Sequence, residues 1–372
     1  MKTKIFLRRL RNLFFSSFWK FRYYFSNEKN QGNVDFIVEN ADWAIKRVGS
    51  YICKEILINS NLKIKTSSKP YKSFGDVIHF GSQYMWVDWG QYLSKNHHYV
   101  VSFFHGSPKD GPDIARHIKE FLKSEPMLSK IIVSNSIVEE RLKQWGVSAN
   151  KIVKIPIGVD MELFQIPSNS QKNNARKFYN FSENTIVIGS FQKDGIGWGD
   201  GMNPKSVKGP DIFLETLSIV RKLFNISVLL TGPARGYLKA GLEEMGIPYS
   251  HTYVEKYSDL SHCYHALDLY LISSREEGGP MALMEGMACG IPIVSTPVGM
   301  SNDFIINEVN GLISEEISAE SLSKSLITAI TLIQKGHFIK EDTRTYINPC
   351  SWTLVAKSHL DKVYNPLLSQ SK

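Results

Sequence analysis

Two glutamates, Glu277 and Glu285, have the residue type and the spacing to hold a polyhydroxylated ligand. They stand in the stretch REEGGPMALMEGMACG, separated by seven residues that include a Gly-Gly-Pro turn. Two carboxylates with different reach can accept hydrogen bonds from hydroxyl groups on two parts of one ligand. The spacing alone leaves a simpler interpretation open, in which Glu277 caps a helix and Glu285 is a solvated residue.

The elements around these glutamates place them at the start of a helix. The apolar run 267–274 predicts a strand, so Arg275–Gly279 is the turn at its carboxyl end. Pro280 suits the first helical position, and Gly290 suits the residue just past the helix end. The free N–H groups and positive dipole end of such a helix attract anions, and paired glycines let a ligand approach the backbone.

Two lysines add positive charge that suits a diphosphate. Lys193 lies directly beyond an expected strand at 185–190, and Lys208 precedes Gly209 and a helix that Pro210 opens. Cations at the carboxyl ends of strands are typical of phosphate sites. The glycines between the two lysines do not form the dinucleotide fingerprint G-x-G-x-x-G, because no helix follows them at once. Surface lysines on a flexible loop are the alternative interpretation.

Short apolar runs typical of strands alternate with helical stretches from residue 34 onward. The expected strands of a first domain are 34–39, 62–66, 76–81, 99–106, 130–136 and 151–159, and those of a second are 185–190, 227–232, 251–254, 267–274 and 291–296. This alternation predicts parallel sheets covered by helices on both faces. We therefore expect two doubly wound, Rossmann-like α/β domains facing each other, with a ligand cleft between the carboxyl ends of their strands.

The net charge of +8 belongs to the amino-terminal end of the chain. Residues 1–25 hold seven Lys and Arg and no acid, whereas the remainder holds 37 basic and 36 acidic residues. Since the body is nearly neutral, a nucleic-acid binder is disfavoured. The four cysteines are widely spaced and form no C-x-x-C pair, which argues against a zinc ribbon or a disulfide framework and for a reducing compartment.

Residues 1–25 predict a basic, aromatic amphipathic helix. Leu and Phe recur at helical spacing among the cations, and no apolar run is long enough for a signal peptide or a spanning helix. A helix of this kind lies on an anionic membrane surface. The alternative is a helix packed on the body with its cations in water.

The segment 253–313 carries a family resemblance. The apolar strand, the acidic pair in an E-x7-E element, Gly-Gly-Pro, ACGIPIV and the final NGLI follow one another in it. This order resembles the nucleotide-sugar signature of the retaining glycosyltransferases of family 4 (glycosyl transferases group 1), which have the GT-B fold. The resemblance runs from about residue 99 to the end, where IPIGVDMELF is similar to the segment that closes the first domain and SWTLVAKSHLDKVYNPLL to a final helix that crosses back onto it.

The resemblance implies a role for each site residue. Glu277 binds hydroxyls of the donor sugar and Glu285 those of the ribose, while Lys193 and Lys208 neutralise the leaving diphosphate, with Lys205 as a competing candidate. His105 faces the donor sugar from the first domain, or is a core histidine. The other donor-binding residues are the backbone groups of Gly278, Gly279, Pro280, Met281 and Ala282 near the sugar and phosphates, and Tyr253 and Val254 near the base.

Together these observations divide the chain into four segments. They are a basic aromatic segment at 1–30, an acceptor-side domain at 31–168, a nucleotide-sugar domain at 169–350 and a returning helix at 351–372. The chain departs from the family where VENADWAIKRVG replaces a glycine-rich turn, with Asp42, Trp43 and Lys46 as possible substitutes.

The resemblance implies a glycosyltransferase acting on a nucleoside diphosphate sugar, with UDP or GDP, and on a glycan or lipid-linked acceptor. No D-x-D-like motif stands out, so we expect no metal and no cofactor. The N-terminal helix places the enzyme at the cytoplasmic face of a membrane, in assembly of bacterial cell-surface polysaccharide or lipopolysaccharide. A sugar-nucleotide epimerase of the same fold and a non-catalytic sugar-nucleotide-binding protein remain as alternatives.

Overall fold

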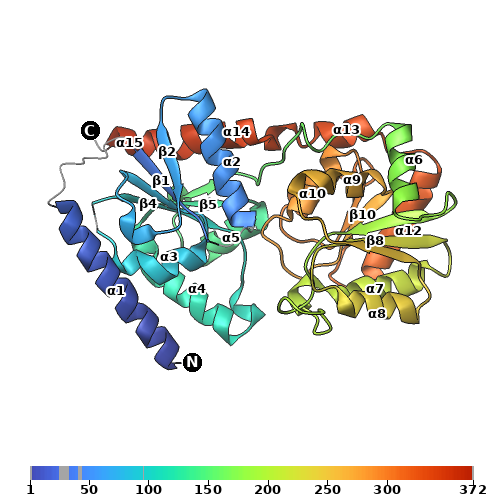
Figure 1. The fold of residues 1–372 in the computed structure, drawn as a ribbon, viewed down its shortest axis with the longest axis horizontal. Coiled ribbons are helices and arrows are strands. Elements are labelled where there is room, and N and C mark those ends of the chain that lie inside the picture. The colour runs from blue at the N-terminus through green and yellow to red at the C-terminus, as the bar shows by residue number, and fades with distance from the viewer. Residues whose placement is uncertain (1, 25–32, 41–43, 95, 371–372) are drawn as a thin grey trace. The chain divides into compact units, whose positions relative to one another are not determined.

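The computed structural model of the 372-residue chain describes residues 2–24, 33–40, 44–94 and 96–370 (Figure 1). The chain divides into two compact units. Unit 1 comprises Met1–Ile157 and Trp352–Lys372, and unit 2 comprises Gly158–Ser351. Each unit contains a six-stranded sheet in which every described strand pair is parallel. The predicted pair of doubly wound α/β domains is therefore confirmed.

The first boundary between the units differs from the one we expected after residue 168. Unit 2 begins at Gly158, because the segment that follows is held by other parts of unit 2. The guanidinium of Arg344 donates a hydrogen bond to the carbonyl of Phe164, at 2.5 Å. The N–H of Val159 donates to the carbonyl of Cys350 at 2.8 Å, and Val159 forms a parallel bridge with Ser351. The Pro- and Ser-rich stretch is thus an internal connection of unit 2. The second boundary lies before Trp352 rather than before Ser351.

Unit 1 is built on a sheet with the strand order β2-β1-β3-β4-β5-β6. Its strands are β1 (Asn33–Ile37), β2 (Lys63–Ser67), β3 (Val77–Phe80), β4 (His98–Phe103), β5 (Leu128–Val133) and β6 (Ile152–Lys154). Its helices are α1 (Lys2–Tyr24), α2 (Ala44–Asn59), α3 (Gln83–Trp89), α4 (Pro112–Ser124), α5 (Ser136–Gln144), α14 (Trp352–His359) and α15 (Asn365–Gln370), with a π-helical turn, η9 (Leu360–Tyr364), between the last two. Figure 1 shows α14 beside α2, and the rings of Tyr51 and Trp352 stack between them at 4.9 Å. Asp42 and Trp43 lie outside the described residues, and Lys46 is part of α2.

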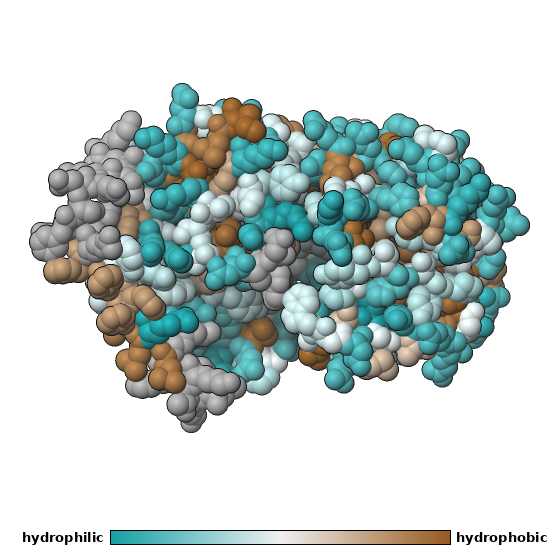
Figure 2. Space-filling view, viewed as in Figure 1, coloured by the Kyte–Doolittle hydropathy of each residue, from teal (hydrophilic) through white to brown (hydrophobic). Residues whose placement is uncertain are grey.

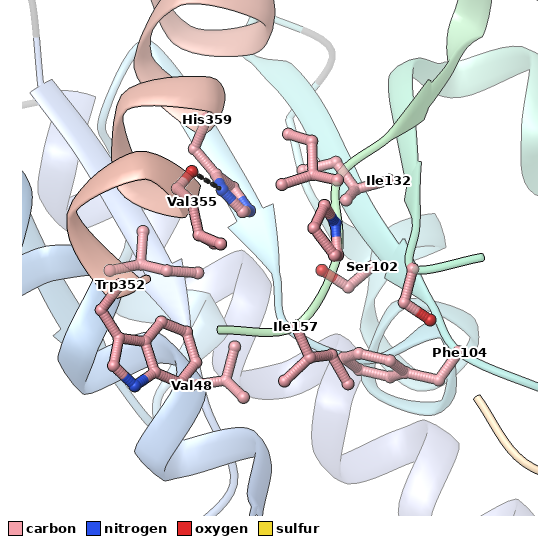
Figure 3. Close-up of a pocket in the computed structure, with 12 residues that line it drawn as sticks. Val48, Ser102, Phe104, Ile132, Ile157, Trp352, Val355 and His359 are labelled. Atoms are coloured by element: carbon pink, nitrogen blue, oxygen red, sulfur yellow. Dashed lines mark hydrogen bonds between the residues drawn. The ribbon is translucent and has the colours of Figure 1, made fainter. Parts of the chain in front are cut away.

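A polar network joins the sheet of unit 1 to its carboxyl-terminal helices. His79 on β3 is fully buried, and its ring bonds to the hydroxyl of Tyr364 at 2.7 Å and to that of Ser102 at 2.9 Å. His359 on α14 bonds through Nδ1 to the carbonyl of Val355 at 2.9 Å (Figure 3). Burial lowers the pKa of both imidazoles, that of His359 to about 4. Both rings are therefore neutral at ordinary pH.

Figure 3 also shows a small cavity beside His359. It measures about 20 Å³ and lies where β4, β5 and β6 end, lined mainly by apolar side chains. This volume holds about one water molecule, so the cavity is not a site for a sugar.

The predicted N-terminal helix is present as α1, and one apolar side of it faces outward, whereas Phe15 and Trp19 face Tyr71. Among the side chains of α1 whose burial the structure describes, the buried ones are Asn12, whose amide donates to the carbonyl of Asp88 at 3.0 Å, and Ser16. Six large apolar side chains are instead 48–69% exposed and follow the helix in Figure 2; they are Leu7, Leu10, Leu13, Phe14, Phe18 and Phe21. A helix of a globular protein normally buries this side. Among the described residues, no helix has the length and the hydropathy required to cross a bilayer.

Unit 2 has the strand order β12-β11-β10-β7-β8-β9. Its strands are β7 (Ile186–Ser190), β8 (Ile226–Thr231), β9 (Tyr249–Thr252), β10 (Leu269–Ile272), β11 (Ile293–Ser295) and β12 (Gly311–Ile313). Its helices are α6 (Asn169–Phe178), α7 (Pro210–Val220), α8 (Gly236–Glu244), α9 (Leu260–His265), α10 (Met281–Ala288), α11 (Ser301–Phe304), α12 (Ala319–Gln334) and α13 (Lys340–Thr345). Strands β8 and β9 extend the sheet on one side of β7, and β10 to β12 extend it on the other. The pair β7–β10 is therefore the point where the strand order reverses, which is the usual ligand position in open α/β sheets.

Candidate nucleotide-sugar site

The candidate site of unit 2 lies at the carboxyl ends of the neighbouring strands β7 and β10. Leu269 of β10 pairs with Ile188 of β7, and Tyr270 pairs with Gly189. Lys193 follows β7 directly, and Glu277 follows β10. Two predicted site residues far apart in the sequence are therefore brought to one sheet edge by strand pairing.

Glu277 is a buried carboxylate that binds a lysine. Only 8% of it is exposed. Its Oε1 accepts hydrogen bonds from Nζ of Lys208 at 2.5 Å and from the hydroxyl of Ser274 at 2.8 Å. No side chain caps α10, so the interpretation of Glu277 as a helix cap is wrong. Pro280 is the N-cap residue, with an extended backbone at ψ 117°, and not the first helical residue as we expected.

Lys208 is positioned by a short helix and by the glycine that follows it. The 3₁₀ helix η6 (Ser206–Lys208) ends at Gly209, whose φ is +60°. A Cβ atom at Gly209 would lie 1.9 Å from the carbonyl oxygen of Ser273. The side-chain amide of Gln192 donates to the carbonyl of Lys208 at 3.1 Å. The pair Lys208-Gly209 therefore packs directly against the chain that leaves β10.

Lys193 and Lys205 complete a group of three cations beside Glu277. The ammonium of Lys193 lies 4.0 Å from the ring centroid of Trp198. Burial lowers the pKa of Lys205, as do the ammonium groups of Lys208 and Lys193, whereas Glu277 raises it. The lysines are thus close enough to repel one another, and an anion with two phosphates would relieve that repulsion.

Glu285 is held by two tyrosines, and the interpretation of it as a solvated residue is wrong. It is 4% exposed. Its Oε1 accepts from the hydroxyl of Tyr257 at 2.5 Å and its Oε2 from that of Tyr264 at 2.7 Å. Burial, followed by the charge of Glu285, raises the pKa of Tyr264 well above its usual range. Each carboxylate oxygen can accept further hydrogen bonds, so Glu285 keeps the capacity to bind hydroxyl groups of a ligand.

The glycine turn and the start of α10 lie between the two glutamates. Gly278 is buried, whereas Gly279, Met281 and Ala282 are half-buried. The first N–H groups of a helix have no partner within it, so the backbone here can donate to an anion. Gly290 has φ +70° and ends this helix, as predicted.

The residues expected near the base lie at the edge of the sheet. Tyr253 and Val254 follow the edge strand β9, and Tyr253 is 63% exposed. None of the hydrogen bonds found among the described residues joins them to Glu277 or Glu285. Their proposed role remains a prediction.

His105 belongs to unit 1 and lies in the loop after β4. It is half-buried, and its carbonyl accepts from the side-chain amide of Gln83 at 3.0 Å. Burial, followed by the charge of His105, lowers the pKa of the neighbouring His117 to about 4. His79 is a fully buried histidine of this sheet, whereas His105 is half-buried in a loop, and its role at the donor sugar remains a prediction.

Sequence reasoning missed the residues that hold the predicted ones in place. Ser274 and Gln192 contact Glu277 and Lys208, and Tyr257 and Tyr264 bind Glu285. Their contacts depend on side-chain packing between elements, for which the sequence carries no local signal. Across the described ranges 2–24, 33–40, 44–94 and 96–370, no three His, Cys, Asp or Glu side chains form a metal-binding group.

Part of this chain is similar to known proteins. The family described as glycosyl transferases group 1 matches residues 204–345. A D-inositol 3-phosphate glycosyltransferase of Segniliparus rotundus is 25% identical over 201 residues, which cover 51% of this chain and 42% of that protein. The lipopolysaccharide core biosynthesis mannosyltransferase LpsB of Rhizobium meliloti is 26% identical over 182 residues, covering 46% of this chain and 47% of LpsB. The matches thus span less than half the length of these relatives.

A solved structure extends the similarity to nearly the whole chain. Anabaena HepE, crystallised in complex with UDP and glucose, superimposes with a TM-score of 0.72 at 16% identity, covering 90% of this chain and 100% of HepE. Residues 204–345 thus match the glycosyl transferases group 1 family, and the fold of the chain is GT-B.

Proposed function

We propose that this protein is a retaining glycosyltransferase of family 4 that needs no metal. It transfers a sugar from a UDP- or GDP-sugar to a glycan or lipid-linked acceptor. The observation that carries the proposal is the contact of Glu277 with Lys208 at the β7–β10 switch point, with Glu285 seven residues further along. LpsB and HepE support it, since the first is a lipopolysaccharide core mannosyltransferase and the second binds UDP and glucose.

The lysines and the start of α10 serve the leaving diphosphate in this proposal. Cleavage of a glycosyl phosphate bond places negative charge on the departing phosphate, and fixed cations and helix N–H groups stabilise that charge. Lys208 and Lys193 are the proposed cations. Retention of configuration follows if the departing phosphate accepts the proton of the acceptor hydroxyl on the same face of the sugar.

The two glutamates orient the donor. Both hydrogen bonds described for Glu277 go to Oε1, and Oε2 is the atom that we assign to a sugar hydroxyl. Glu285 binds the ribose, with its carboxylate oriented by Tyr257 and Tyr264. Tyr253 and Val254 contact the base, and His105 of unit 1 contacts the donor sugar.

The acceptor is reached at the cytoplasmic face of a membrane, in assembly of cell-surface polysaccharide or lipopolysaccharide. The outward apolar side of α1 supports this part of the proposal, because a row of exposed Leu and Phe among Arg and Lys suits an anionic bilayer surface. LpsB and a capsular polysaccharide glycosyltransferase of Staphylococcus aureus are similar proteins with related assignments.

A transfer assay with paired variants tests the proposal. UDP- and GDP-sugars are first screened by thermal shift, and transfer from the best donor is then measured for wild type, Glu277→Gln and Glu276→Gln. We expect Glu277→Gln to lower turnover by about 10² or more, because its sugar contact is made at the reacting centre, and Glu276→Gln to retain it. Wild-type turnover by Glu277→Gln would refute the assignment. Donor conversion without any acceptor would indicate an epimerase, and binding without turnover a non-catalytic protein.

A further inference from the structure

Arg235 is a fully buried arginine at the same end of the sheet as the three lysines. It lies in the turn between β8 and α8 and is 1% exposed. Its Nε donates to Oδ1 of Asp194 at 3.0 Å. One terminal nitrogen donates to the carbonyls of Ser190 and Thr231 at 2.7 and 2.6 Å, and the other to the hydroxyl of Ser190 at 3.0 Å. Arg235 thus links the ends of β7 and β8 by hydrogen bonds to Asp194, the residue that follows Lys193.

This ion pair is costly to bury. Asp194 is 1% exposed, and its Oδ2 has no hydrogen-bond partner among the residues that the structure describes. Burial lowers the pKa of Arg235 and raises the pKa of Asp194, although each charge favours the ionised form of the other. Buried pairs often stabilise a fold less than apolar side chains of equal volume would. A role in fixing local geometry accounts for the pair better than a role in stability.

The ion pair of Arg235 and Asp194 lies at the base of a hairpin formed by residues 195–204. Gly195 pairs antiparallel with Pro204, and the N–H of Ile196 donates to the carbonyl of Asn203 at 2.9 Å. At the base, the N–H of Lys205 donates to the carbonyl of Asp194 at 2.6 Å. The flexible loop of the alternative interpretation is therefore a hairpin with paired ends in the structure.

The hairpin is also docked on the turn that contains Arg235. The N–H of Gly236 donates to the carbonyl of Asp200 at 2.7 Å, and that of Tyr237 to the carbonyl of Gly201 at 3.1 Å. A Cβ atom at Gly201 would lie 2.1 Å from the carbonyl carbon of Ala234. The backbone of the hairpin therefore packs directly against the turn that holds the ion pair.

We propose that Arg235 and Asp194 are positioning residues that hold Lys193, Lys205 and Lys208 in the arrangement that binds the donor diphosphate. Lys193 directly precedes Asp194, and the N–H of Lys205 donates to the carbonyl of Asp194. The N–H of Lys208 in turn donates to the carbonyl of Lys205 at 2.8 Å. The inference rests on the proposed function, since the diphosphate is the ligand that needs these cations. Arginine is required because its planar group offers several donors in a fixed geometry.

Binding of nucleotides and nucleosides to the full chain tests this inference. Calorimetry gives the Kd of UDP and of uridine, with GDP and guanosine in parallel, for wild type, Arg235→Met, Arg235→Lys, Asp194→Asn and Lys208→Met. We expect Arg235→Met to weaken diphosphate binding by about tenfold or more, the scale of a lost charge-assisted contact, and to leave nucleoside binding unchanged. Leu326→Ala, which makes a cavity in the core beside α12, is the control for general destabilisation.

Each outcome decides for or against the inference. The measured quantity is the ratio of the nucleoside Kd to the diphosphate Kd. If Arg235→Met leaves this ratio unchanged, the inference is overturned. The inference is also overturned if Leu326→Ala changes the ratio as much as Arg235→Met does. If Arg235→Met does not fold, the same ratio is read in Arg235→Lys and Asp194→Asn. If Lys208→Met changes the ratio and the Arg235 and Asp194 variants do not, only this inference fails. If Lys208→Met leaves the ratio unchanged too, the proposed function fails with it.

Discussion

The ammonium of Lys208 and the carboxylate of Glu277 meet at 2.5 Å, although they come from different strand–helix connections of unit 2. The contact joins the group proposed for the diphosphate to the group proposed for the sugar. Because both side chains are largely buried, at 21% and 8% exposure, solvent screens this pair less than a surface pair. In the proposed site Oε1 of Glu277 keeps this contact, and Oε2 is left to accept from a sugar hydroxyl.

We expect Glu285 to bind the ribose of a nucleotide and Lys208 to bind its diphosphate. We expect Glu285→Gln to weaken UDP and uridine to the same degree, by about tenfold, because it acts on the ribose that both contain. Lys208→Met should weaken UDP alone. Isothermal titration calorimetry with UDP and with uridine gives, for each variant, the Kd of each ligand relative to its wild-type Kd. Loss of UDP affinity without loss of uridine affinity in Glu285→Gln would contradict the ribose assignment.

The pKa of Lys205 gives donor binding a pH dependence of known sign. Burial and the nearby ammonium groups lower this pKa, so Lys205 loses its proton at a lower pH than an ordinary lysine. Since a diphosphate prefers the protonated form, UDP affinity should be greatest below that pKa and decrease as pH rises through it. Affinity is measured at pH values above the last phosphate pKa of UDP and below the pKa of its uracil N3–H, with Lys205→Met as the variant that should lose the dependence. The same profile in both proteins would contradict a role for Lys205.

Gly209 offers a measurement of how tightly Lys208 is packed. Gly209→Ala introduces both a left-handed alanine and a Cβ at 1.9 Å from a carbonyl oxygen, and we expect a loss of about 3 kcal/mol in stability. Gly246→Ala is a matched control, since its φ is +61° and no atom lies within 4 Å of the added Cβ. It should cost about 1 kcal/mol. Equal losses in chemical denaturation would show that Ser273 and Gly209 are not in close contact.

The histidines of unit 1 should make its stability depend on pH. The folded pKa of His359 is about 4, below its ordinary 6.5, so unfolding takes up a proton between these values. The contribution of neutral His359 to the free energy of unfolding is complete above pH 6.5. It is lost as pH falls toward 4, at up to about 1.4 kcal/mol per pH unit. Hydrogen exchange of β3 and β4 amides reports unit 1 specifically. His359→Gln keeps a donor for the Val355 carbonyl and should make the stability of unit 1 depend less on pH. If the variant shows the same dependence of stability on pH as wild type, this account is wrong.

The exposed side of α1 should bind anionic vesicles. We expect wild-type protein to float with phosphatidylglycerol vesicles and the triple variant Leu10→Ser, Phe14→Ser, Phe18→Ser to stay behind, since each buried apolar side chain contributes about 1.5–3 kcal/mol. Leu57→Ser with Ile58→Ser is the control, because these residues of α2 are 55% and 65% exposed. If the triple variant floats as wild type does, the membrane role of α1 is wrong.

Much of the fold follows from local sequence pattern. The run LDLYLISS became β10, and DVIHFG became β3, because continuous apolar residues between helical stretches have few alternatives to a buried parallel strand. Strand β12 (Gly311–Ile313) was not predicted as a strand. Its three residues are too few to show a period, and its pairing with β11 defines it.

The site was predictable only where residues adjoin one another in the chain. Glu277 and Glu285 are marked by the turn and helix between them, and Lys208 by Gly209 and Pro210. Nothing local marks Arg235 or Tyr264, whose partners lie 41 and 21 residues away. Such contacts arise from how β8, α9 and α10 pack in unit 2.

The bridge between Val159 and Ser351 makes unit 2 a self-contained insertion for protein engineering. Both ends of the segment Gly158–Ser351 are joined to each other by a 2.8 Å backbone hydrogen bond and a parallel bridge. Cutting the gene after Ile157 and before Trp352 therefore interrupts no strand of either sheet. Unit 2 can therefore be exchanged as one segment between chains of the same fold, with unit 1 supplied by another such chain.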